Sequence, residues 1–311
     1  METVVCNLCG SDQQVTLFTA HDLRYKTPGR FSVTRCLRCH LVFVSPRPTV
    51  LEIEKHYPSI TREHLSVAAP NLFALEQAKK VIARHSEQGT ILDVGCAAGY
   101  FLSAMQERGW KVYGVEPDDA ASKTALTVPG SIVKQGILEA SDFSELKFDA
   151  ITFWSSLEHL HDPSATLEIV RQRLKPEGFL YLGVPNFDSL ERRLFRAKWF
   201  HLDVPRHLYH FTTATLKAML ERVGLEIVEV KHASGHEGVV SSLKMTLGLK
   251  LNEAPTSTGI NESTETEQHS LHATQSLPSR FKGFVTSSVV NMADRLGQGS
   301  QILIVARPSR T

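Results

Sequence analysis

From residue 90 to residue 230, short apolar runs alternate with longer segments whose apolar residues recur every three or four positions. The short runs are typical of buried strands, and the second pattern is typical of helices. The predicted strands span 91–94, 111–115, 131–133, 148–154, 179–184, 225–230 and, later in the chain, 301–306. The predicted helices span 71–85, 99–108, 118–126, 162–174 and 212–223. This alternation predicts an α/β fold, in which a doubly wound, mainly parallel sheet of seven strands carries helices on both faces.

Several helix ends carry recognisable signals. Asp162 stands at a helix cap and Pro163 at the first helical position, where each residue type is favoured. Thr212 is expected to cap the last of these helices, and Gly224 to stop it. Residues 175–178, Lys-Pro-Glu-Gly, are expected to end a helix before the strand at 179–184.

The same patterns divide the chain into four parts. The predicted parts are an N-terminal module at 1–48, a core at 71–232, an insertion at 233–300 and a last core strand at 301–308. Within the insertion, 253–279 is rich in Ser, Thr, Glu, Asn and Gln, which predicts disorder because such residues cannot form an apolar core. Weakly amphipathic stretches at 237–250 and 280–296 flank it.

Charge and composition argue against some partners. The 311 residues include 34 Lys and Arg against 33 Asp and Glu, a net charge of +1. Nucleic-acid-binding domains are usually strongly basic, so we do not expect a nucleic-acid partner. No apolar run reaches about 18 residues, which predicts no membrane span. The N-terminal residues lack the pattern of a secretory signal, so we expect a cytoplasmic protein with reduced cysteines.

The sharpest motif is the segment from Ile91 to Phe101, ILDVGCAAGYF, where a strand meets a tight turn of small residues and then a helix. Small residues let the backbone approach a bound cofactor closely. Asp93 at the strand end can accept a hydrogen bond or pair with a cationic amino group. A dinucleotide site would need G-x-G-x-x-G, whereas Gly95 and Gly99 give G-x-x-x-G. An ordinary tight turn is the alternative reading.

This segment resembles motif I of the class I S-adenosylmethionine (SAM)-dependent methyltransferases, D-x-G-x-G-x-G, with Ala97 at the middle glycine. The resemblance implies a Rossmann-like fold and SAM as cofactor. Glu116 closes the next strand, 17 residues beyond Gly99, where a carboxylate can bind both ribose hydroxyls or remain a solvated strand end. Residues 148–160 resemble motif IV and the segment after it, and 174–180 resemble the helix–turn–strand that follows in such enzymes. The cofactor-binding residues implied are Asp93, Gly95, Ala97, Gly99, Glu116, Gly136, Ile137 and Trp154.

Four cysteines form two C-x-x-C pairs in the N-terminal module. The pairs are Cys6 with Cys9 and Cys36 with Cys39, separated by 26 residues that a hairpin can fill. Four thiolates at this spacing suit tetrahedral zinc, and because they leave no open coordination position the metal is expected to be structural. The alternatives are a redox dithiol and unconnected buried cysteines.

Two histidines follow strands at the edge of the sheet where ligands bind. His159 follows the strand at 148–154, and His207 lies between the next strand and the last helix. A four-cysteine module before a SAM-binding core resembles the zinc-containing sugar C-methyltransferases, although this chain has no room for their C-terminal domain. That resemblance implies that His159 and His207 act in the active site, and a histidine is a suitable base near neutral pH. His201 and His210 are further candidates.

The same loop offers two further kinds of site. Arg206 could hold an anionic group of a substrate or form a surface salt bridge. His207 and His210, together with Glu158, could bind a catalytic divalent metal.

The leading hypothesis is methyl transfer from SAM to a small-molecule acceptor, such as a sugar, a quinone-like compound or another secondary metabolite, with a histidine base and with the zinc module in the substrate lid. One alternative is an RNA or protein methyltransferase whose module grips the polymer through its basic residues, which are Arg24, Lys26, Arg30, Arg35 and Arg38. Another alternative is a SAM-binding scaffold without catalysis. The acceptor atom and the oligomeric state stay open.

Overall fold

The computed structural model describes residues 1–57, 72–234, 236–249 and 292–310. Seven strands form one sheet in the order β10-β11-β8-β7-β4-β5-β6. Each neighbouring pair from β8 to β6 is parallel, and β11 is antiparallel to both of its neighbours. The predicted mainly parallel, seven-stranded sheet is therefore confirmed. Its strands are β4 (Thr90–Val94), β5 (Lys111–Glu116), β6 (Ile132–Gln135), β7 (Phe148–Trp154), β8 (Leu174–Pro185), β10 (Leu225–Ala233) and β11 (Gln301–Pro308).

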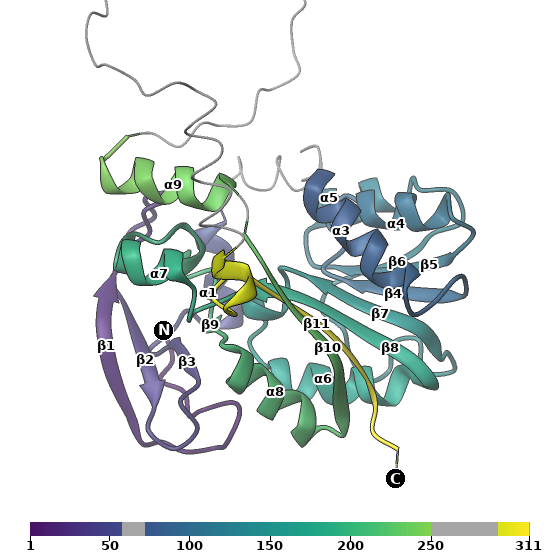
Figure 1. The fold of residues 1–311 in the computed structure, drawn as a ribbon, viewed down its shortest axis with the longest axis horizontal. Coiled ribbons are helices and arrows are strands. Elements are labelled where there is room, and N and C mark those ends of the chain that lie inside the picture. Colours follow the sequence, from purple (N-terminus) through teal and green to yellow (C-terminus); the bar gives the residue numbers. More distant parts are fainter. Residues whose placement is uncertain (58–71, 235, 250–291, 311) are drawn as a thin grey trace, which may run out of the picture.

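Helices cover both faces of this sheet (Figure 1). One apolar cluster packs residues of α3 and α4 against the sheet, and a second packs residues of α6 and α8 against the opposite face. The helices are α3 (Leu72–Ala83), α4 (Tyr100–Gln106), α5 (Asp119–Ala125), α6 (Pro163–Arg173) and α8 (Thr213–Arg222). The sheet lies between two helical layers, as the alternating pattern predicts.

The predicted caps form as hydrogen bonds. Asp162 accepts from the backbone N–H of Ala165 at 3.0 Å, and Thr212 accepts from that of Thr215 at 3.2 Å. Helix α6 ends at Arg173, just before the stop expected at 175–178, but these four residues belong to β8, so the strand begins at Leu174 rather than at 179. A register shift in the pairing of β7 with β8 accommodates them.

A second, four-stranded sheet has the order β1-β2-β3-β9, with every neighbouring pair antiparallel. Its strands are β1 (Gln14–Ala20), β2 (Phe31–Cys36), β3 (Val42–Val44) and β9 (Tyr209–His210). The β1–β2 hairpin fills the gap between the two cysteine pairs. Because β9 comes from the loop that carries His207, the N-terminal segment and that loop are joined by backbone hydrogen bonds.

Short helices connect these layers. They are α1 (Val50–Ile53), η1 (Glu54–His56), η2 (Leu157–His159), α7 (Leu190–Phe195), η3 (Arg196–Lys198), η4 (Phe200–Leu202) and α9 (His236–Thr246). Helix α9 forms within the first amphipathic stretch of the predicted insertion. The predicted disordered segment 253–279 lies outside the described residues, as does most of 280–296. None of the helices in the described part of the chain is long and apolar enough to cross a membrane.

Candidate active site

The turn between β4 and α4 has a backbone that requires small residues. Gly95 and Gly99 have φ angles of +83° and +80°, in the left-handed region where glycine is least strained. A Cβ atom at Gly95 would lie 2.6 Å from the Cβ of Ser156, and one at Gly99 would lie 2.9 Å from the Cα of Ala125. Ala97 also has a left-handed φ of +45°. The two glycines and the alanine thus keep the turn close to its neighbours, and this accounts for the motif.

Asp93 lies buried at the carboxyl end of β4. Thr152 Oγ1 donates a hydrogen bond to Asp93 Oδ1 at 2.6 Å. Burial and the nearby charge of Glu116 raise the pKa of Asp93 to about 7, although the bond from Thr152 opposes this shift. A cationic partner would offset the cost of burying this charge, so the carboxylate suits an ammonium group.

Glu116 ends β5 and is 5% exposed, so it is not a solvated strand end. Its two carboxylate oxygens accept from the backbone N–H groups of Ala97 and Asp118, each at 2.9 Å. Burial raises its pKa in spite of these two bonds. Each oxygen keeps a further lone pair, which a ribose hydroxyl could use.

Three other predicted cofactor residues surround the same strand ends. Gly136 has a φ of +118°, and a Cβ there would have open space within 4 Å. Ile137 beside it is 56% exposed, which leaves an apolar side chain free to cover a flat ring. Trp154 ends β7, and its buried indole Nε1 has no hydrogen-bond partner among the described residues. These features leave room for an aromatic base and a donor for it.

The two histidines lie side by side, with ring centroids 4.6 Å apart and nearly perpendicular planes. His159 Nδ1 lies 3.0 Å from the backbone carbonyl oxygen of Arg206 and 2.9 Å from the hydroxyl of Tyr57. His207 Nδ1 lies 2.8 Å from the carbonyl oxygen of His201. Because a carbonyl only accepts, each Nδ1 carries the ring proton and each Nε2 keeps a lone pair.

Glu158 completes this group. Both of its carboxylate oxygens are buried and have no hydrogen-bond partner among the described residues. His207 Nε2 lies 4.0 Å from Glu158 Oε1 and 3.9 Å from Asp203 Oδ2. Burial raises the pKa of Glu158 to about 8 and lowers that of His159 to about 4. Burial and the neighbouring His159 also lower the pKa of His207, so both imidazoles are neutral at pH 7.

The structure changes three details of the predicted loop. The trio that could share a divalent metal is Glu158, His159 and His207, whose ligand atoms lie within 4.8 Å of one another. His210 is absent from this trio because its ring is buried and stacks on Phe187. Arg206 is 1% exposed and paired with two carboxylates, so neither the surface salt bridge nor an open anion site describes it. His201 contributes only its backbone carbonyl to the pair.

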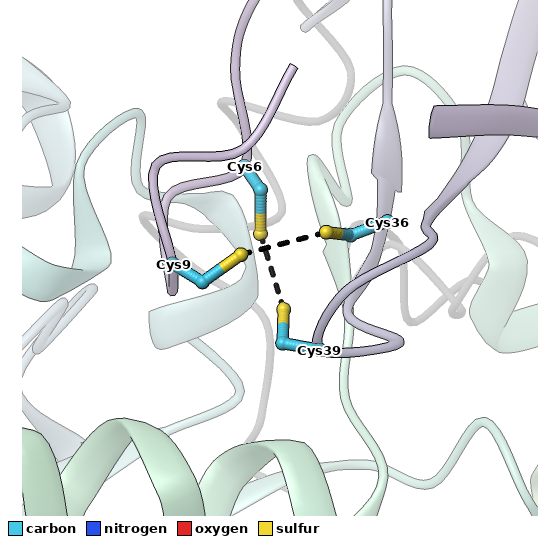
Figure 2. A group of neighbouring side chains, drawn as sticks. All are labelled: Cys6, Cys9, Cys36 and Cys39. Carbon is cyan, nitrogen blue, oxygen red and sulfur yellow. Dashed lines mark hydrogen bonds between the residues drawn. The ribbon is translucent and has the colours of Figure 1, made fainter. Parts of the chain in front are cut away.

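The four cysteines converge at one end of the small sheet, as Figure 2 shows. Cys6 Sγ lies 3.3 Å from Cys39 Sγ, and Cys9 Sγ lies 3.5 Å from Cys36 Sγ. Burial opposes ionisation of Cys36, but backbone N–H groups lower its pKa to about 7. Tetrahedral zinc with bonds of about 2.3 Å would hold its sulfurs roughly 3.8 Å apart. The group therefore has the donor set and nearly the spacing for zinc.

Both cysteine turns also share one backbone form. The N–H of Gly10 donates to the carbonyl of Cys6, and the N–H of His40 donates to that of Cys36. Gly10 and His40 have left-handed φ angles of +72° and +64°. Each C-x-x-C pair thus turns in the same way and presents its two thiols to one point.

Sequence patterns did not point to three residues around the histidines. Tyr57, Asp22 and Asp203 all contact the pair or its supports, yet none lies in a periodic segment or in a motif. Only the pairing of β3 with β9 and the burial of Arg206 bring them together, and sequence spacing carries no signal for either.

Known proteins that are similar to this chain are methyltransferases. The model of the family described as "Methyltransferase domain" matches residues 69–230, more than half of the chain. A ubiquinone biosynthesis O-methyltransferase of Thiobacillus denitrificans is 28% identical over an alignment of 152 positions, and the match covers 45% of this chain and 66% of that relative. One of Pasteurella multocida is 32% identical over an alignment of 111 positions, and the match covers 31% of this chain and 46% of the relative. The chain thus matches less than two thirds of the length of these relatives.

Among solved structures, the chain is similar to a SAM-dependent methyltransferase from Archaeoglobus fulgidus. The two share 18% identity and a TM-score of 0.50, and the match covers 79% of this chain and 97% of that one. This likeness concerns the fold alone. Together with the family match and the glycine turn between β4 and α4, it leads to one conclusion: the chain belongs to the methyltransferase domain family, with the class I fold of SAM-dependent methyltransferases.

Proposed function

We propose that this protein transfers the methyl group of SAM to a small-molecule acceptor, with His207 as general base and His159 beside it. One observation carries the proposal. Two neutral imidazoles with free Nε2 lone pairs lie beside the unpartnered carboxyl group of Glu158, which follows β7 two residues after Ser156, the residue that packs against Gly95. A base in this place can reach an acceptor that is held against a cofactor bound at the strand ends.

The residues around the turn fit SAM. Asp93 would hold its ammonium group and Glu116 its ribose hydroxyls, while Gly95, Ala97 and Gly99 let the backbone approach it. Gly136, Ile137 and Trp154 would surround the adenine side. When bound, SAM supplies a methyl group on a sulfonium, which an acceptor attacks in line.

His207 takes the proton that the acceptor loses. Its Nδ1–H is held by the carbonyl of His201, so Nε2 receives the proton. The imidazolium that forms lies 3.9 Å from the ionised carboxylate of Asp203 and 4.0 Å from Glu158, whose pKa of about 8 leaves it mainly protonated at pH 7. The charge of Asp203 stabilises the protonated ring in this buried site. His159 is held by Arg206 and Tyr57, and its ring packs against the ring of His207.

We also propose that residues 1–48 form a zinc-binding module, with Zn²⁺ held by Cys6, Cys9, Cys36 and Cys39. The four thiols leave no open position, so the metal would act on folding rather than on the acceptor. In this division, residues 71–232 and 301–308 form the methyltransferase core, and 233–300 form an insertion.

A small acceptor is favoured over a polymer for two reasons. The net charge of +1 gives no broad attraction to nucleic acid. Arg24, one of the basic residues proposed to grip a polymer, instead packs over Phe200 and lies 3.6 Å from Asp203. The curated relatives are named for ubiquinone biosynthesis and O-methylation, which makes quinone-like phenols the first acceptors to test.

A divalent metal in the active site is a second candidate, and the unpartnered Glu158 favours it. Two imidazole nitrogens and a carboxylate are a common ligand set for divalent transition metals. The Nδ1–H bonds to carbonyl oxygens would orient the ligands, as is usual for metal-bound histidines. Activity that survives chelation and is not raised by Mn²⁺, Fe²⁺, Zn²⁺ or Mg²⁺ would exclude this candidate.

Calorimetric titration with SAM tests the proposal, using the wild-type protein and Asp93→Ala. We expect binding in the micromolar range that the substitution abolishes, followed by turnover in a screen of phenolic and sugar acceptors. A folded wild-type protein that does not bind SAM would refute the proposed function. SAM binding without turnover on any acceptor class would favour the scaffold hypothesis.

A further inference from the structure

A buried arginine connects the N-terminal segment to the histidine pair. Arg206 Nη1 and Nη2 donate to the two carboxylate oxygens of Asp22 at 2.9 and 2.8 Å. Its Nε and Nη2 also donate to Asp203, at 3.2 and 2.6 Å. The side chains of all three residues are at most 4% exposed. Two-pronged bonds of this kind fix the direction of a guanidinium as well as its position.

Asp22 is itself held by the turn that follows β1. It accepts from the backbone N–H groups of Arg24 and Tyr25 at 3.0 Å, and from the hydroxyl of Thr27 at 2.7 Å. Burial alone would raise its pKa, but the bonds and charge of Arg206 keep it low, so the carboxylate is ionised. A rigid anion of the N-terminal segment therefore faces the loop at 203–207.

Arg206 and Asp203 reach both histidines. The backbone carbonyl of Arg206 accepts from His159 Nδ1 at 3.0 Å. Asp203 lies 3.9 Å from His207 Nε2, and its carbonyl accepts from the N–H of His207 at 3.0 Å. The loop that Asp22 anchors thus orients the ring of His159 through the carbonyl of Arg206, and it places the carboxylate of Asp203 beside His207.

A second path starts from the same guanidinium. Arg206 Nη1 donates to the backbone carbonyl of His56 at 2.9 Å, one residue before Tyr57. The hydroxyl of Tyr57 lies 2.9 Å from His159 Nδ1. Arg206 therefore supports both partners of His159 Nδ1: one is its own backbone carbonyl, and the other is Tyr57, whose neighbour His56 it binds.

We infer that Asp22 is a positioning residue for methyl transfer, which acts through Arg206 to hold His159 and His207 in their reactive directions. This inference rests on the proposed function. It gives the N-terminal segment a role in the chemistry, because that segment contributes an anion to the support of the base.

The test compares Asp22→Asn with Asp12→Asn, a matched change at an exposed aspartate of the same segment. The asparagine keeps the shape but loses the charge and one acceptor for Arg206. We expect kcat to fall by about 10- to 100-fold, the size of effect that a misplaced catalytic group causes. The Kd for SAM should stay within about twofold, because Asp93 and Glu116 lie on other strands. Asp12→Asn should match the wild type in both.

Nuclear magnetic resonance of histidine-labelled protein gives a readout that needs no turnover. Each Nδ1–H that is held by a carbonyl should give a downfield, slowly exchanging signal, assigned with His159→Asn and His207→Asn. In Asp22→Asn we expect the His159 signal to be lost or broadened at temperatures well below unfolding. Unchanged imidazole signals and an unchanged kcat, even with a lower Tm, would overturn the inference and leave Asp22 a role in stability only.

Thr27→Val supplies a milder variant, should Asp22→Asn fail to fold. It removes the hydroxyl that donates to Asp22 while leaving both charges in place, so we expect a smaller loss of kcat and a partial change in the His159 signal. An unaltered His159 signal and kcat in this variant would count against the inference. If the wild type shows no turnover, the proposed function fails, and the imidazole signals still decide whether Asp22 positions the histidines.

Discussion

The cofactor side and the acceptor side of this site are built in different ways. The cofactor side takes its residues from the ends of three strands that are neighbours in the sheet, with Asp93 on β4, Glu116 on β5 and Trp154 on β7. The acceptor side joins Asp22, Tyr57, Glu158 and His207, which are far apart in the chain and lie mostly on loops. A regular sheet fixes the first group locally, whereas the second depends on the docking of the small sheet.

Removal of zinc should have the largest effect, and it should impair the acceptor side far more than the cofactor side. Structural zinc contributes roughly 10–16 kcal/mol to the folding of small modules. Without it, or in Cys36→Ser, we expect the small sheet to loosen and turnover to be lost, because β3 pairs directly with β9. SAM binding should weaken far less. Metal analysis together with calorimetry checks this, and a purified protein without zinc but with full turnover would contradict it.

His207→Ala should affect the acceptor side alone. General base catalysis contributes about 10²- to 10⁴-fold, so we expect a loss of kcat in that range. Because SAM is proposed to be held by Asp93, Glu116 and the glycine turn and not by His207, the Kd for SAM should not change. The matched variant His85→Ala replaces a histidine that contacts Glu229 just ahead of β4, outside both the cysteine module and the site, and it tests whether any lost histidine has this effect. Equal losses in both variants would argue against a base role for His207.

The contrast between the cofactor side and the acceptor side explains which features of this fold can be predicted from the sequence. The strands of the sheet, the helix caps and the motif around Gly95 follow from local patterns, because each depends on neighbours along the chain. The start of β8 does not, since residues 175–178 join this strand at a shift in its register with β7. The directions of His159 and His207 depend on the carbonyls of Arg206 and His201, and no side-chain pattern reports on backbone carbonyls.

Acid should destabilise the acceptor side through its buried histidines. Burial lowers the pKa of His159 and His201 to about 4 and that of His210 to about 3, and it also lowers that of His207. As pH falls below about 6.5, these four groups take up protons in the unfolded chain but not in the native one, so stability falls. Each proton changes the free energy of unfolding by about 1.4 kcal/mol per pH unit.

The buried carboxyl groups act in the opposite direction. The raised pKa values of Asp93, about 7, and of Glu158, about 8, mean that the native state binds these two protons first as pH falls. Seven histidines have lowered pKa values, these four and His56, His161 and His232, against four buried carboxyl groups with raised ones, which include Glu116 and Glu191. Unfolding in acid therefore takes up protons on balance, so stability should be greatest near pH 6.5 and fall toward pH 5. Urea unfolding from pH 5 to 8.5 measures this, and Glu158→Gln should flatten the alkaline side. A stability that rises steadily from pH 6.5 to pH 5 would contradict the assignment of neutral buried histidines.

The smallest effect is expected from Asp93→Asn, a change that separates stability from function on the cofactor side. The pKa of Asp93 is raised by burial to about 7, so at pH 8 its charge opposes folding of the unliganded protein. Asp93→Asn removes that charge and can still accept the bond from Thr152 through its amide oxygen. We expect the Tm without SAM to rise by about 2–4 °C at pH 8, since each kcal/mol shifts Tm by roughly that amount in a domain of this size.

The same substitution should abolish the rise in Tm that SAM gives to the wild type, because a neutral amide cannot balance the ammonium group. Asp12→Asn, which removes a charge from the surface, should change neither quantity. A lower Tm in Asp93→Asn would mean that the carboxylate stabilises the unliganded turn, and the site would then be held together by its charge. A higher Tm with lost SAM binding would mean that Asp93 is kept at a cost to stability, because a cationic ligand needs a buried anion in that place.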